Sequence, residues 1–179
     1  MTKKIIIGVV AVLVVLAAYF MLRPPKSPPK TTAFSENGLE ISVSYSQPSK
    51  RGRLIFGEEK DGALQPYGKY WRLGANAATE ITFNKNILFA GQPVNAGSYR
   101  MYAVPGPASF QISLNSELGV TFTAASEPDY TKDVLKVDVP VETIPEVEQF
   151  VINFGTDSTG VNMDFTWDNV RVRVPIKVQ

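Results

Sequence analysis

The chain contains neither histidine nor cysteine. Their absence excludes Ser-His-Asp triads, thiol nucleophiles, zinc sites with nitrogen or sulfur ligands, c-type haem and iron–sulfur clusters. It also excludes disulfides and lipid attachment through a thiol. Any catalysis would rest on carboxylates, lysine, tyrosine or a hard cation such as Ca²⁺. We therefore expect no metal site and no cofactor, and we favour a non-enzymatic role while leaving enzymatic activity open.

Charge is absent from one long stretch, which runs from Ile5 to Leu22 behind Lys3 and Lys4. A helix over this stretch would be about 27 Å long, close to the hydrocarbon thickness of a bilayer. A helix is also the open-ended structure that satisfies every backbone polar group in lipid. The sequence therefore predicts a single transmembrane helix, with the lipid bilayer as a partner of residues 5–22.

The charges beside this stretch indicate its orientation. Lys3, Lys4 and the amino terminus form a short positive tail that favours the cytoplasm. The rest of the chain is then expected on the periplasmic or extracytoplasmic side of the inner membrane. The alternative is a cleaved secretory signal, although the apolar run is longer than usual and bulky Leu16 precedes the small pair Ala17-Ala18. Both interpretations export the rest of the chain.

Prolines and lysines dominate the residues that follow, including Pro24-Pro25 and Pro28-Pro29. This composition favours an extended polyproline II stalk or a flexible spacer. We therefore divide the chain into a tail and transmembrane helix (1–22), a Pro-rich linker (23–37) and an extracytoplasmic domain (38–179). The last part is long enough for one domain with its own core.

The charge balance of the exported part argues against nucleic acid as a partner. Residues 1–30 hold five of the 18 basic residues and none of the 17 acidic ones, which leaves 13 basic against 17 acidic residues, a net charge of −4. A mildly acidic domain without a basic, aromatic-rich groove is not suited to binding a polyanion. We expect no nucleic-acid partner.

Apolar and polar residues alternate with a period of two through most of the domain, interrupted by Gly, Asn, Asp and Pro. Leu39, Ile41 and Val43 alternate with Glu40 and Ser42, and several later segments repeat the pattern. Short strands of this kind are typical of antiparallel sheets that bury one face. The predicted fold is all-β, a two-sheet antiparallel sandwich of Greek-key or jelly-roll kind, preceded by the one transmembrane helix.

The end of the chain predicts a hairpin whose turn is Asp168-Asn169. Counting outward from that turn pairs Trp167 with Val170 and Phe165 with Val172 on one face. The other face then sets Asp164 against Arg173, so that opposite charges meet.

One segment of the domain departs from simple alternation and is the predicted functional site. Tyr67, Trp71, Arg72 and Asn76 combine aromatic surfaces with a cation and an amide, which suits a polar small molecule, a glycan or a protein partner. The alternative is that Trp71 plugs the core while Arg72 pairs with a carboxylate such as Glu80.

The same segment carries a resemblance to a known family. The motifs are Gly52-Arg53-x-Ile55-Phe56-Gly57, Pro66-Tyr67-Gly68, Trp71-Arg72-x-Gly74-Ala75-Asn76-x-x-Thr79 and Ala96-Gly97-Ser98-Tyr99. In these motifs the chain resembles the bacterial family of domain of unknown function 2911, over about residues 40–178. The resemblance implies an exported, often membrane-attached β domain without a settled biochemical activity.

Three classes of function remain. The favoured hypothesis is a membrane-anchored binding or accessory module of unknown biochemical activity, such as a subunit of an envelope membrane complex. The first alternative is a glycan-active hydrolase that uses paired carboxylates, for which Glu58, Glu59 and Asp61 are available. The second is a purely structural helper that docks through its transmembrane helix.

Overall fold

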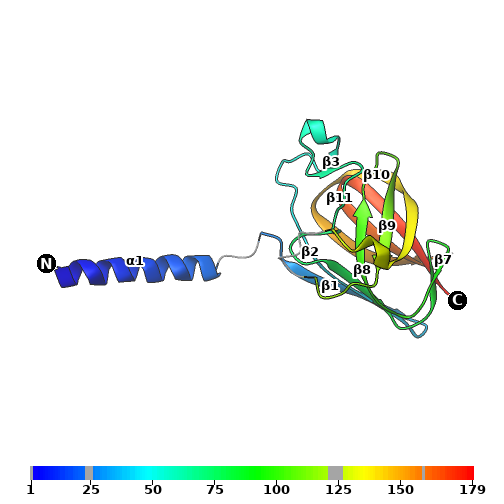
Figure 1. The fold of residues 1–179 in the computed structure, drawn as a ribbon, viewed down its shortest axis with the longest axis horizontal. Helices are drawn as coiled ribbons and strands as arrows, with labels where there is room; N and C mark the ends of the chain where they lie inside the picture. The colour runs from blue at the N-terminus through cyan, green and yellow to red at the C-terminus, as the bar shows by residue number, and fades with distance from the viewer. Residues whose placement is uncertain (1, 23–25, 121–126, 159) are drawn as a thin grey trace.

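The chain forms an N-terminal helix followed by a domain of β strands (Figure 1). The computed structural model describes residues 2–22, 26–120, 127–158 and 160–179. Helix α1 (Thr2–Leu22) confirms the helical conformation predicted for residues 5–22. Within the described residues, no helix has both the length and the apolar character needed to cross a membrane.

The strands of the β domain form one large antiparallel sheet and one small sheet, which confirms the all-β class. The large sheet has nine strands in the order β1-β2-β5-β8-β9-β10-β11-β6-β7, and β3 pairs with β4 in parallel in the two-stranded sheet. The strands are β1 (Pro29–Glu36), β2 (Leu39–Ser46), β3 (Phe56–Gly57), β4 (Gln65–Pro66), β5 (Thr79–Phe83), β6 (Ile87–Phe89), β7 (Gln92–Val94), β8 (Gly97–Val104), β9 (Ser109–Asn115), β10 (Asp133–Asp157) and β11 (Gly160–Val178), with short 3-10 helices η1 (Glu59–Asp61) and η2 (Tyr130–Lys132).

Strand β10 joins the two halves of the large sheet. Residues 133–140 pair with β9, whereas residues from Val141 onward pair with β11. The sheet is therefore continuous where two separate sheets of a sandwich were expected, because one long strand belongs to both halves. Apolar side chains from both halves enclose a single core.

The core follows from the alternation seen in the sequence. On β2, Leu39, Ile41 and Val43 are buried while Glu40 and Ser44 are exposed. Each such apolar side chain contributes about 1.5–3 kcal/mol when it leaves water. The period-two pattern thus decides which face of the strand turns inward.

The linker predicted over residues 23–37 is corrected by strand β1. Pro29–Glu36 pair along their whole length with β2, from Pro29 opposite Ser46 to Glu36 opposite Leu39. The turn is Asn37-Gly38, with φ of 52° and 74°, the conformation that tight hairpins require. The β domain therefore begins well before residue 38, and Pro24-Pro25 lie outside the described residues.

The terminal hairpin predicted at Asp168-Asn169 is wrong, because residues 160–178 form one continuous strand that pairs with β10. Phe165 lies opposite Ile152 and Val172 opposite Val141, so the two do not pair with each other. The predicted contact between Asp164 and Arg173 is nevertheless present. Arg173 donates through Nε and Nη2 to both carboxylate oxygens of Asp164, at 2.8 and 2.7 Å. In a straight strand these residues would stand about 30 Å apart. The strand must therefore bend between them. Asp168 has a φ of 56°, and the ladder with β10 is irregular on both sides of it, which places the bend there.

Candidate functional site

Six neighbouring strands each place one polar residue on a single line across the sheet. The registers join these residues in succession from β1 to β10. We call this line the polar row. Ser44, Glu80 and Arg100 lie on the face opposite the core, because both neighbours of each along its strand are buried. The polar row consists of Thr31, Ser44, Glu80, Arg100, Asn115 and Asp133.

Arg100 is the buried centre of the polar row, with a side chain that is only 1% exposed. Its Nη1 donates to Oε2 of Glu117 at 2.9 Å, and its Nη2 donates to the hydroxyl of Tyr70 at 2.7 Å. The guanidinium also lies 5.8 Å from the centre of the Tyr70 ring. A carboxylate, a hydroxyl and an aromatic face therefore compensate the charge of Arg100.

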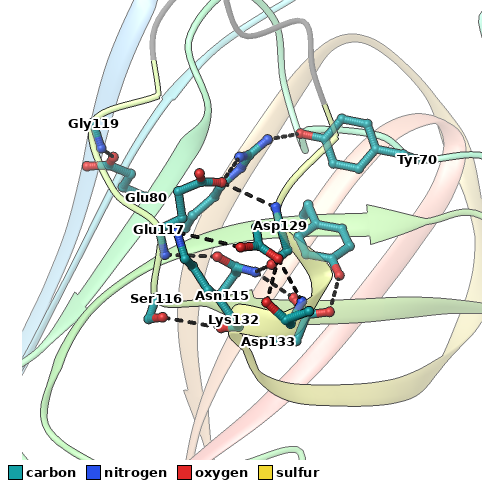
Figure 2. Close-up of polar contacts among 12 residues, drawn as sticks. Tyr70, Glu80, Asn115, Ser116, Glu117, Gly119, Asp129, Lys132 and Asp133 are labelled. Atoms are coloured by element: carbon teal, nitrogen blue, oxygen red, sulfur yellow. Dashed lines mark hydrogen bonds and ion pairs between the residues drawn. The ribbon is translucent and has the colours of Figure 1, made fainter.

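Asn115 and Asp133 form a second hydrogen-bonded group beside Arg100 (Figure 2). Asn115 donates through Nδ2 to Oδ1 of Asp133 at 2.8 Å, and the Tyr102 hydroxyl donates to Oδ2 at 2.8 Å. Lys136 forms an ion pair with the same carboxylate at 2.9 Å. Asp133 is thus held by internal partners on both of its oxygens.

Two tyrosines beside this group resist ionisation. Burial raises the pKa of the Tyr102 hydroxyl, and its hydrogen bond to Asp133 raises the pKa further. Burial also raises the pKa of Tyr130 to about 12, assisted by the bond from its hydroxyl to Glu127. Both hydroxyls therefore act as hydrogen-bond donors at neutral pH rather than as bases.

Residues 116–120 and 127–132, which we call the covering segment, pack over the half of the polar row that contains Arg100, Asn115 and Asp133. Figure 2 shows Glu117 and Asp129 converging on Asn115 and Asp133. The backbone N–H of Glu117 donates to Oδ1 of Asn115 at 2.8 Å, and that of Gly119 donates to Oε1 of Glu80 at 2.7 Å. These bonds hold the covering segment against the sheet, and the segment in turn shields the outward-facing side chain of Arg100 from water. Residues 121–126 lie outside the described part of the chain.

The other half of the polar row opens into a groove of about 640 Å³. Thr31, Ser44 and Glu80 contribute to its lining, together with the cation of Lys30. The groove thus offers hydroxyls and charges of both signs. Its full lining consists of residues 29–31, 44–46, 77, 78, 80, 119 and 120.

Trp71, the aromatic centre of the predicted site, belongs to the core. Its side chain is 3% exposed, and its ring packs among Phe56, Phe110, Phe150 and Trp167 at centroid distances of 5.0–6.5 Å. Its indole N–H donates to the carbonyl of Gly74 at 3.3 Å. Trp71 therefore has no free face for a ligand in this structure, which favours the alternative that it plugs the core.

Arg72 and Asn76 lie together in the segment that leads into Ala77 of the groove, although neither of them lines it. Nη1 of Arg72 donates to the backbone carbonyl of Asn76. Asn76 has a φ of 62° and donates through Nδ2 to the carbonyl of Ser27 at 3.2 Å. These bonds link the segment that precedes groove residue 77 to the segment that precedes β1. Both side chains remain partly exposed.

Tyr67 does not line the groove, and its partly exposed side chain packs against the core. Its backbone N–H donates to Gly57 at 2.9 Å, and the following Gly68 donates to Pro105 at 2.8 Å. Of the four predicted site residues, the structure therefore brings only Arg72 and Asn76 together beside an open groove.

The carboxylates required by the hydrolase alternative are not arranged as a pair in a cleft. Glu58, Glu59 and Asp61 lie exposed at the short helix η1, and Glu59 pairs with Lys69 at 3.4 Å. No group of three or more acidic residues that could hold a metal ion occurs among the described residues. The arrangement around the groove can bind through hydrogen bonds and charge, without an evident proton-transfer pair.

Sequence reasoning missed the polar row. Arg100 stands between the inward Tyr99 and Met101, so its outward direction was legible from alternation. Its meeting with Asn115 and Asp133 depends on the register between strands far apart in the chain, for which the sequence held no signal.

No match was found among curated proteins or among solved structures. A family model described as "Protein of unknown function (DUF2911)" matches residues 27–176. This range begins just before β1 and includes the polar row, the groove and the core. The chain therefore belongs to the DUF2911 family of proteins of unknown function, as the motifs around Trp71 and Tyr99 indicated.

Proposed function

We propose that the β domain is a non-catalytic binding module that takes a segment of a partner protein into the groove beside Arg72 and Asn76. The observation that carries this proposal is the difference between the two halves of the polar row. The covered half is satisfied internally, as Arg100 and Asp133 illustrate. The other half opens into the groove of about 640 Å³.

The chemistry of the groove suits a polar polypeptide segment. Lys30 and Glu80 offer charges of opposite sign, and Thr31 and Ser44 offer hydroxyls that donate or accept. Such a lining satisfies the backbone and side-chain polar groups of a peptide without depending on one net charge. In this proposal the two halves of the continuous sheet pack on each other like the sheets of a Greek-key sandwich, and this rigid body keeps the groove open.

We also propose that α1 attaches the module to a lipid bilayer, with the β domain outside the cytoplasm. Apolar side chains on all sides of the helix are exposed, including Ile7 at 68% and Val15 at 67%. A helix that is apolar all round requires a cover of lipid or protein. The alternatives are removal of residues 1–22 as a signal and a protein groove that receives α1.

Protease added to spheroplasts tests the location. The proposal expects digestion of the β domain in intact spheroplasts and co-sedimentation of the undigested chain with membranes. Protection of the domain until the cells are lysed would contradict the external location. A shortened chain in the soluble fraction would support signal cleavage instead.

Arginine substitution tests the groove. Ser44→Arg places a long side chain into the groove, whereas Ser98→Arg makes the same change at an exposed position of the same sheet face. Partners captured by the tagged full-length chain are purified, and their affinities for the two variants are measured. We expect Ser44→Arg to weaken binding about tenfold or more, as blocking a central contact does. Equal affinities of the two variants would refute the groove as the binding site.

A further inference from the structure

The two edge strands of the large sheet differ in how readily they could pair with a strand of another chain. Strand β7 is only three residues long and contains Pro93, which cannot donate a ladder hydrogen bond. Strand β1 is eight residues long and is the outermost strand on the opposite side. Figure 1 shows it along the margin of the β domain.

The hydrogen-bond phase of β1 determines which backbone groups face outward. Gln47 donates its N–H to the carbonyl of Pro28 at 2.9 Å, one step beyond the pairing of Pro29 with Ser46. Bonded and non-bonded pairs alternate along an antiparallel ladder. Even-numbered residues of β1 therefore direct their backbone groups toward β2. The N–H and C=O groups of Thr31, Ala33 and Ser35 point away from the sheet, and all three residues are exposed.

The charges of β1 are complementary to those of a second copy that runs in the opposite direction. If Ala33 lies on a two-fold axis, Lys30 of one copy stands opposite Glu36 of the other, and this occurs twice. Thr31 then stands opposite Ser35, so that the outward backbone groups meet in bonded pairs. Lys30 and Glu36 meet in the non-bonded pairs, where side chains are closest. A shift of two residues would lose both charge pairs.

We propose that two copies of the chain associate through their β1 strands, antiparallel and centred on Ala33, to form one continuous sheet. The occupant of this edge is therefore a second copy of the chain, in a two-fold arrangement that closes on itself. Lys30 and Thr31 belong both to this edge and to the lining of the groove, so the two surfaces adjoin. The inference itself is argued from the backbone phase and the charges of β1, without the groove's partner.

Cysteine crosslinking of the full-length chain tests the register, because the natural sequence has no cysteine. Only a residue on the two-fold axis can reach its own copy: Ala33 pairs with Ala33 at a Cα separation of about 5.5 Å, within disulfide range. Ala33→Cys is expected to form a covalent dimer on mild oxidation by copper phenanthroline. Thr31→Cys and Ser35→Cys, each about 13 Å from its own copy, are expected to crosslink only when the two variants are mixed. Equal crosslinking at all three positions, or none at Ala33→Cys, would overturn the proposal.

Charge exchange gives a second readout that does not depend on oxidation. Lys30→Glu sets like charges opposite one another, and we expect the dissociation constant of the dimer to rise about tenfold. The double variant Lys30→Glu/Glu36→Lys restores opposite pairs and is expected to regain the natural value. Mass photometry of the detergent-solubilised chain measures both. A natural chain that stays monomeric, or a double variant no better than the single one, would contradict the arrangement.

Discussion

Arg100 carries a charge that is almost wholly removed from water, so its partners determine what that burial costs. Glu117 is the carboxylate that neutralises it, at 2.9 Å. The hydroxyl of Tyr70 accepts a second hydrogen bond from the guanidinium at 2.7 Å. Removing one partner of a buried pair is costly because the remaining charge stays uncompensated. The integrity of the covered half of the polar row therefore depends on this pair.

The first prediction concerns Glu117. Glu117→Gln is expected to lower the free energy of unfolding by about 2–3 kcal/mol, since Arg100 loses its counter-charge in a buried position. The matched control is Glu142→Gln, because Arg171, the partner of Glu142, keeps 31% of its side chain exposed. That change is expected to cost about 1 kcal/mol or less. Urea denaturation followed by fluorescence of buried Trp71 and Trp167 measures both, and equal costs would contradict this account.

The second prediction concerns the pH dependence that Tyr102 contributes. The pKa of its hydroxyl lies above the ordinary value of 10.0 in the folded chain. The folded state thus holds this proton more tightly than the unfolded state. The resulting stability is present below pH 10 and falls as the pH rises beyond it, by about 1.4 kcal/mol per pH unit.

Tyr102→Phe provides the comparison. At pH 7 the variant is expected to be about 1 kcal/mol less stable, because the hydrogen bond to Asp133 is lost. Above pH 10 this difference is expected to shrink, since the variant has no phenol to ionise at that position. Urea denaturation at a series of pH values measures it, with Tyr67→Phe as the control. A difference that stays constant from pH 7 to pH 11 would be the contrary result.

At the scale of elements, the segment between β4 and β5 is fixed by close backbone packing. Gly74 has a φ of 153°, and a Cβ at this position would lie 2.8 Å from the carbonyl oxygen of Ser46. Thr79 supports the same turn by donating to the carbonyl of Leu73 at 2.7 Å. The segment that carries Arg72 and Asn76 is thereby held against the end of β2.

The third prediction follows from that contact. Gly74→Ala is expected to cost about 2–4 kcal/mol, from backbone strain together with a clash against backbone that cannot rotate away. Gly68→Ala is the matched control, because Gly68 has a φ of 73° with open space around it. It is expected to cost about 1 kcal/mol from the conformation alone. Thermal unfolding followed by tryptophan fluorescence distinguishes the two, and similar losses would argue against close packing at Gly74.

The fourth prediction tests where the β domain begins. A chain of residues 27–179 retains β1 and is expected to unfold cooperatively. A chain of residues 38–179 loses β1, which uncovers the edge of β2 and removes Phe34 from its contact with Phe154 at 6.0 Å. We expect this shorter chain to aggregate or to unfold at a much lower urea concentration. Equal stability of the two chains would show that β1 is not an integral part of the domain.

The strands differ in how far the sequence could predict them, and the reasons are physical. Strand β2 was predictable because only one of its faces is buried, so that apolar and polar residues alternate along it with a period of two. Strand β1 was missed because its neighbouring prolines dominate the composition, although Asn37-Gly38 marked its hairpin turn. The contact between Asp164 and Arg173 was predicted from a local hairpin that does not form, because β11 pairs with β10 over this stretch. The polar row was not predictable from the sequence, since it depends on contacts between strands that are far apart in the chain.

The predicted site, which lies in a single loop, also shows how far the sequence alone can predict function. Aromatic residues beside a cation suit both a binding surface and a core plug, and burial decides between them. Trp71 is enclosed by other aromatic rings, whereas Arg72 and Asn76 stay partly exposed in the segment that precedes groove residue 77. The composition of the segment singled it out, but the direction in which each side chain points could be determined only from the structure.

At the scale of the whole molecule, the features form a consistent arrangement. One face of the curled sheet closes over a core, and the opposite face carries a row that is half covered and half open. The apolar helix α1 precedes the edge strand beside the open half. The proposal of a tethered module that presents a groove to a partner rests on these three features together.

Photocrosslinking from the sheet face is the most direct test of the groove as a contact surface. A photoreactive amino acid placed at Ser44, inside the groove, is compared with one at Ser98, on the same face outside it. The account predicts a discrete crosslinked protein from position 44 in living cells and none from position 98. The same adducts from both positions, or none from position 44, would contradict the claim that this groove receives a partner.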